Sequence, residues 1–164
     1  MAPAGGAGLL GAIERSPVAA AMRGDLWLYP IVEIFHISGF VILVGAVVMF
    51  DLRLLGLSPH ISARALARHL LPWSAGALLI IVPTGLMMFS AHASEFVDNP
   101  AFLVKLTLIT LALTNAAAFH AGVFRTAERW ELDTPAPTAA KLHALVSIGL
   151  WFGVISCGRL LAYV

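Results

Sequence analysis

The chain has 164 residues, of which 60% are hydrophobic and only 12% are charged. A water-soluble domain of this size needs more charge than this to cover its surface, so the composition excludes a soluble globular protein. The formal net charge of +1 lacks the basic excess of a nucleic-acid-binding protein, and the single cysteine, Cys157, cannot form an internal disulfide.

Four apolar stretches follow one another along the chain, over residues 30–56, 70–91, 101–124 and 140–163. Each is close to the roughly 20 residues that cross the hydrocarbon core of a bilayer. Residues 1–29 lack the pattern of a cleavable signal peptide, so we interpret them as an extramembrane or interfacial segment. The sequence therefore predicts an all-α integral membrane protein, with one up-and-down four-helix bundle over residues 30–163.

The charges in the connections predict the orientation. Lysine and arginine are concentrated in the first and third connections, whereas the charged residues of the second connection are both acidic, Glu95 and Asp98. Loops rich in lysine and arginine stay on the cytoplasmic side of a membrane. We therefore expect a multi-pass protein of the bacterial inner membrane, with the first and third loops inside and both termini in the periplasm.

Ionisable residues inside an apolar span are costly and mark buried or functional faces. In the first span Glu33 and Asp51 project in the same direction, and His36 lies about 60° from them. We expect these residues to face the bundle interior, either as hydrogen-bonding contacts between helices or as a protonatable path.

One side of the second span combines a histidine, small residues and a thioether: His69, Trp73, Gly76, Ile80, Pro83 and Met87. Such a side suits a flat cofactor that lies between helices. An interfacial histidine, a glycine at a close helix contact and a methionine in the core explain the same residues equally well.

The third and fourth spans also contain polar residues. Lys105 lies toward the outer end of the third span and His120 toward its inner end, whereas the fourth has His143 at its inner end and Arg159 at its outer end. Because polar groups lie on several sides of the third span, protein should surround it. We therefore expect a homo-oligomer.

Three histidines from three different spans, His69, His120 and His143, lie within about two turns of the inner helix ends. Helical bundles build cofactor sites from facing side chains, and imidazole is a common haem ligand. The chain has no Cys-x-x-Cys-His sequence, so any haem is non-covalent haem b. We predict a haem on two of these histidines, with further cofactor contacts from nearby residues: Arg68, Arg125 and Trp73.

A second haem is predicted in the outer layer, where His36 and Met87 lie at depths that agree to about one turn. Methionine ligation would raise its reduction potential. Lys105 and Arg159 would neutralise its propionates, and Glu33 would support His36. The alternative is that His36 hydrogen bonds within the bundle and Met87 fills core space.

Several short runs resemble the pattern of a bacterial family of small four-helix membrane proteins of unknown function: Trp27-Leu28-Tyr29-Pro30, Val32-Glu33, His36-Ile37, Asp51-Leu52-Arg53-Leu54-Leu55-Gly56, Asn115 with Phe119-His120, and Gly158-Arg159. The resemblance extends over about residues 27–163. It implies a four-helix membrane fold and places six polar residues in the family pattern: Glu33, His36, Asp51, Arg53, His120 and Arg159. It implies no particular activity.

The leading hypothesis is a b-type cytochrome-like protein that binds one or two haems and carries electrons within or across the membrane. An electron carrier with an unidentified redox partner is favoured over an enzyme with its own substrate. The alternatives are a transporter or proton relay that uses Glu33, His36 and Asp51, or an assembly subunit without haem.

Overall fold

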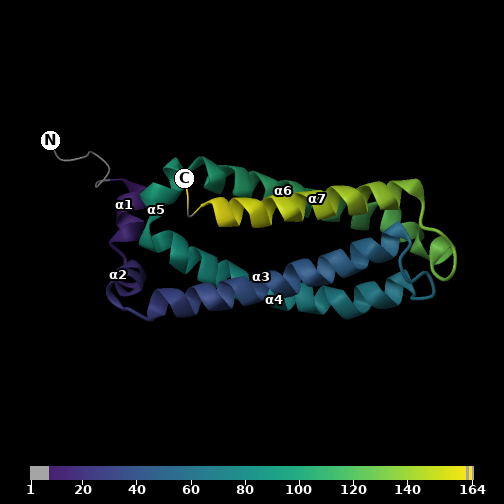
Figure 1. Ribbon diagram of the computed structural model, residues 1–164, viewed down its shortest axis with the longest axis horizontal. Coiled ribbons are helices and arrows are strands. Elements are labelled where there is room, and N and C mark those ends of the chain that lie inside the picture. Colours follow the sequence, from purple (N-terminus) through teal and green to yellow (C-terminus); the bar gives the residue numbers. More distant parts are fainter. Residues whose placement is uncertain (1–7, 162, 164) are drawn as a thin grey trace.

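The computed structural model describes residues 8–161 and 163, and no strand occurs among them. Four long helices run side by side along the long axis of the molecule (Figure 1): α3 (Leu28–Leu55), α4 (Ala63–Ala91), α6 (Pro100–Ala121) and α7 (Thr138–Leu160). Each is long and apolar enough to cross a membrane. The predicted all-α fold with four apolar helices is confirmed, and the chain is a multi-pass membrane protein.

Short helices lie at both ends of this bundle. At one end, the terminal end, lie α1 (Leu9–Glu14), α2 (Pro17–Gly24) and α5 (Ala93–Asp98), beside the end of α7 (Figure 1). The opposite end, the loop end, consists of residues 56–62 and the 3₁₀ helix η2 (Val123–Trp130). The loop end corresponds to the predicted inner side.

The start of α4 differs from the sequence prediction. The helix begins at Ala63, whereas the apolar stretch begins at residue 70. The Ser62 hydroxyl accepts a hydrogen bond from the Ala65 amide at 3.0 Å and caps the helix. The added turns contain Arg64 and Arg68, so the helix continues beyond its apolar part. Hydropathy locates the stretch that suits lipid and does not locate the end of a helix.

Glycines allow α3 and α4 to pack closely. A Cβ atom added to Gly39 would lie 3.0 Å from Cγ1 of Ile81, and one added to Gly85 would lie 3.1 Å from Cε1 of His36. Small residues at such contacts are typical of membrane helices. In the same way α6 packs along α7, and α3 also contacts α7, which joins the two pairs. No comparable contact joins α4 to α6.

The N-terminal helices are docked on the terminal end. Arg23 Nη1 donates to the carbonyl of Ala91 at 2.7 Å. One carboxylate oxygen of Glu14 accepts from the Ser94 amide at 2.8 Å and from the Ser94 hydroxyl at 2.6 Å. Met22 packs with Val32 and Ala91 in a small apolar cluster. Residues 8–27 are therefore folded onto the bundle.

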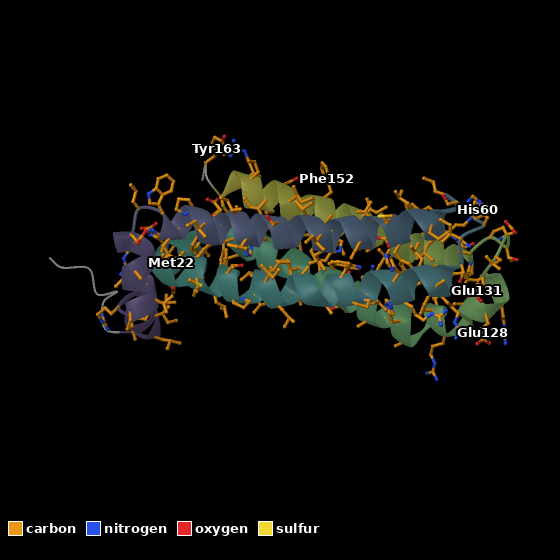
Figure 2. All side chains as sticks on the ribbon, turned by 90° about the horizontal axis from the view of Figure 1, so that it is seen from below. Met22, His60, Glu128, Glu131, Phe152 and Tyr163 are labelled. Carbon is orange, nitrogen blue, oxygen red and sulfur yellow. The ribbon has the colours of Figure 1, made fainter. Side chains whose placement is uncertain are left out.

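A buried arginine holds the loop end together. Arg53 is 3% exposed, and its guanidinium donates to the carbonyls of Ile61 at 2.5 Å, Pro59 at 3.0 Å and Glu131 at 2.8 Å. These carbonyls belong to the two connections at this end, where Figure 2 also shows Glu131 and His60. The five donors of a guanidinium suit it to such multiple bonds.

Candidate functional site

A cleft of about 230 Å³ lies in the loop-end half of the bundle, between all four long helices. Most of its lining is apolar, and four of the lining residues are also exposed at the surface: Leu71, Leu78, Leu113 and Ala116. Leu71 and Leu78 belong to α4, and Leu113 belongs to α6. The cleft therefore opens sideways between α4 and α6, whose ring contact, Phe89 stacked on Phe102, lies at the terminal end of the bundle.

Asp51 contributes a buried carboxyl group to the cleft. It is 5% exposed and lies on α3. Ser147 of α7, which also lines the cleft, hydrogen bonds to the carboxyl group. The other oxygen, Oδ2, has no hydrogen-bond partner among the described residues. A buried polar atom without a partner is costly, so it is a reason to look for a functional role.

His143 lines the same cleft and is fixed by a side chain of the neighbouring helix. Asn115 of α6 donates from Nδ2 to the backbone carbonyl of His143 at 3.0 Å. This bond turns the amide oxygen toward Nδ1 of His143, at 2.7 Å. Because the oxygen can only accept, Nδ1 carries a proton, and in the neutral ring Nε2 has the free lone pair.

His120 also lines the cleft and shows the same pattern. Its Nδ1 lies 2.9 Å from the carbonyl oxygen of Ala116, one turn earlier in α6. A carbonyl only accepts, so Nδ1 again carries the proton and Nε2 the lone pair. The ring of Phe119 contacts both imidazoles, with centroid distances of 5.3 Å to His120 and 5.7 Å to His143. The structure thus brings two of the three predicted inner histidines to one cleft.

The third inner histidine lies elsewhere. His69 is exposed and does not line the cleft, and Trp73, one turn later in α4, is 59% exposed. The side of α4 that contains His69 and Met87 is predicted from the sequence to face a cofactor. In the half of α4 nearest the loop end, however, this side faces away from the bundle. The buried face of α4 is marked instead by alanines, Ala63, Ala67 and Ala77. The spacing of these alanines is the sequence feature that predicts which side of α4 faces the bundle.

The predicted arginine contacts also lie outside the cleft. Arg68 and Arg125 are exposed near the loop end, and Arg125 borders a small polar depression beside the ion pair between Arg64 and Glu128, whose atoms are 2.6 Å apart. Neither arginine lines the cleft. Both guanidinium groups therefore lie at the surface of the loop end.

The predicted outer residues do not share one site in the described structure. His36 Nδ1 lies 3.1 Å from the Ile81 carbonyl and 3.0 Å from the Thr84 hydroxyl, in the close contact between α3 and α4. Met87 packs beside the cluster around Met22, and Glu33 is exposed. The expectation that Glu33 and Asp51 both face the interior is wrong for Glu33.

Of the two cations predicted in the outer layer, Lys105 lies close enough to His36 to interact with it electrostatically. Lys105 is half-buried, with Nζ beside Gly158, 3.8 Å from the position of an added Cβ. Arg159 is exposed and donates to the Tyr163 hydroxyl at 2.5 Å, and its guanidinium lies over the Tyr163 ring at 4.9 Å. The cleft does not extend to either residue.

Two residues of this region were not selected as site residues from the sequence. Asn115 and Arg53 appeared only as matches to a family pattern, yet each makes hydrogen bonds that hold two elements together. A polar residue within an apolar span was the available signal for Asn115. Across residues 8–161 and 163, no group of three or more histidine, cysteine or acidic side chains is arranged to bind a metal ion.

Comparisons with known proteins give one match. Neither the curated proteins nor the solved structures contain a match to this chain. A family model covers residues 28–164, which includes all four long helices and every residue that lines the cleft. By this match the chain belongs to the Family of unknown function (DUF6644).

Proposed function

We propose that the protein is a b-type cytochrome-like electron carrier, with one haem b in the cleft and His120 and His143 as axial ligands. The observation that supports this proposal most is the state of the two imidazoles. Both line one apolar cleft, and both use Nδ1 as a donor, which leaves Nε2 to bind a metal. Metal-binding histidines in proteins usually have their other ring nitrogen bonded in this way.

The chemistry of the cleft suits a porphyrin better than its size does. Aromatic and aliphatic side chains form most of the wall, and Phe50, Phe119 and Trp151 are among them. The volume of about 230 Å³ is below the ~300–1,000 Å³ of pockets that enclose whole ligands. Since the cleft reaches the surface between α4 and α6 in the loop-end half, we expect α4 to move outward there to admit the group.

The residues around the cleft would bind and orient the haem. Haem b supplies one-electron redox chemistry when it is bound. Asn115 and the Ala116 carbonyl orient the two imidazoles, and the apolar wall excludes water. Arg68 and Arg125 lie exposed near the same end of the bundle, where propionates that project from the cleft would meet them.

The wider setting of the proposal comes from the sequence. We propose a bacterial inner-membrane location with both termini in the periplasm, a homo-oligomer, and an unidentified redox partner. A second haem on His36 and Met87, with Lys105, Arg159 and Glu33 nearby, stays a prediction. The close packing of α3 on α4 at Gly85 leaves that haem less room than the cleft offers.

A second candidate function, proton relay or coupled transport, is favoured by Asp51. Its Oδ2 atom is buried in the cleft and has no hydrogen-bond partner in the described part of the chain, as expected of a carboxyl group that gains and loses a proton or a ligand. Proton flux into proteoliposomes tests this candidate. Flux that Asp51→Asn abolishes would support it, and wild-type vesicles no leakier than empty ones would refute it.

The haem ligands are tested by single alanine variants, each purified after expression with ample haem supply. His120→Ala and His143→Ala should each lose haem or convert its spectrum. His69→Ala, which changes an exposed histidine of the same end, is the matched control and should behave as wild type. If the first two variants keep the haem content and spectrum of the wild type, the ligand assignment is wrong.

A further inference from the structure

We infer that Asn115 is a positioning residue: it fixes the tautomer and the orientation of the His143 imidazole, so that Nε2 is offered to the cleft as a ligand nitrogen. The inference rests on the proposed function only for the identity of the metal group that Nε2 binds.

The geometry selects one arrangement of the two side chains. The Asn115 amide bonds to His143 twice, to its backbone carbonyl at 3.0 Å and to Nδ1 at 2.7 Å. If the amide were turned by 180°, its oxygen would face the carbonyl oxygen, and two acceptors would repel each other. The His143 carbonyl therefore determines the orientation of the Asn115 amide, and the amide oxygen in turn requires the proton of the imidazole to be on Nδ1.

The two hydrogen bonds together restrain the His143 side chain more than either bond would alone. The backbone carbonyl and the ring of His143 are joined through the rotatable χ1 and χ2 bonds, and Asn115 contacts both of them. The bonds hence limit the rotation of the imidazole as well as its tautomer. The residues also come from different helices, α6 and α7, so the orientation of the ring depends on the packing of this helix pair.

The two histidines of the cleft differ in how they are held. His120 is bonded to a backbone carbonyl of its own helix, which no substitution removes. His143 depends on a side chain. Among the described residues, Asn115 is thus the side chain whose substitution can release a cleft imidazole without changing the imidazole itself.

A purely structural role is the competing interpretation. Polar side chains in membrane proteins commonly hydrogen bond between helices and stabilise their contact. Such a contact needs no particular state of the histidine ring, whereas a positioning role requires the proton on Nδ1. The tautomer of His143 is therefore the property that separates the two roles.

Two variants and a control test the inference. Asn115→Leu removes both bonds and keeps the branched shape of the side chain. Asn115→Asp, with its buried carboxyl group protonated, keeps an acceptor oxygen for Nδ1 and an O–H that can donate to the His143 carbonyl. Thr114→Val is the control, because Thr114 is exposed and its hydroxyl already bonds to the Thr110 carbonyl of the same helix at 2.8 Å. The measurement is the two-bond ¹H–¹⁵N spectrum of histidine-labelled protein, free of haem, in detergent micelles.

Wild type, Thr114→Val and Asn115→Asp should show His143 protonated at Nδ1, whereas Asn115→Leu should show a shift toward the Nε2–H form. An unchanged Nδ1–H signal in Asn115→Leu would overturn the inference. If that variant does not fold, Asn115→Asp decides: an Nε2–H form there would equally contradict the inference.

Haem binding supplies an independent readout. Loss of a hydrogen bond behind a metal-binding histidine typically weakens metal binding by ~10- to 100-fold. Asn115→Leu should weaken haem binding to this extent, and Thr114→Val should leave it unchanged. A wild-type protein that binds no haem would refute the proposed function, while the tautomer measurement would still decide the role of Asn115.

Discussion

Replacing Asp51 by leucine should make the protein more stable. The carboxyl group is 5% exposed, and Oδ2 has no partner among the described residues. A buried polar atom left without a hydrogen bond costs about 1–3 kcal/mol. Leucine is larger than aspartate, but the side chain borders a cleft of about 230 Å³ that can take the added methyl groups without strain. We therefore expect a gain of about 1–3 kcal/mol.

Thermal unfolding in detergent micelles measures this gain. For a chain of this size, 1 kcal/mol shifts the Tm by ~2–4 °C, so Asp51→Leu should raise the Tm by ~2–12 °C. Ser147→Ala is the control, because it removes the hydroxyl that bonds to the carboxyl group and leaves the group itself. A lower Tm for Asp51→Leu would refute the reasoning, since it would show that the carboxylate has a stabilising partner. A gain would indicate that the group is kept for function at a cost in stability.

Three further predictions concern the ends of the bundle. Arg53→Met should destabilise the protein by about 3 kcal/mol in thermal unfolding, because three carbonyls lose a charged donor; an unchanged Tm would contradict this. Hydrogen bonds from Ser94 hold the pKa of Glu14 below its usual value of 4.5, so the contact of α1 with α5 should persist above that value and be lost as pH falls through the lowered pKa. The protection of the Ser94 amide against hydrogen exchange, relative to the unfolded chain at the same pH, should fall over that range, and in Glu14→Gln it should be low already at neutral pH. Equal protection in the two proteins at neutral pH would exclude a role for Glu14. Cysteines introduced at Glu95 and Arg129 should be labelled from the periplasm at position 95 only, and labelling at 129 in intact cells would reverse the orientation.

Hydropathy was sufficient to predict the four long helices. In lipid a backbone must satisfy its hydrogen bonds internally, so an apolar stretch of spanning length has few alternatives to a helix. The short helices α1 and α2 were not predicted, because they are brief and rich in alanine and glycine. They are held by specific bonds such as those of Arg23 and Glu14 to residues far along the chain. Contacts of this kind have no periodic signal in a sequence.

The candidate site was predicted in part. The depth of His120 and His143 follows from counting residues along each span, and the structure places both at one cleft. The rotation of α4 does not follow from depth. It is set by alanines and glycines that allow close approach, such as Gly85 against His36, while His69 was chosen for its chemistry. In a membrane, small residues mark the packed face more reliably than polar residues do.

The reduced-minus-oxidised absorption spectrum of the purified wild-type protein, together with its haem content per chain, tests the central claim most directly. The protein should be expressed with ample haem supply, so that a lack of haem in the cell does not limit loading. A haem in the cleft predicts a reducible Soret band and α band with at least one haem per chain. A colourless protein that also fails to take up added haem would contradict the account.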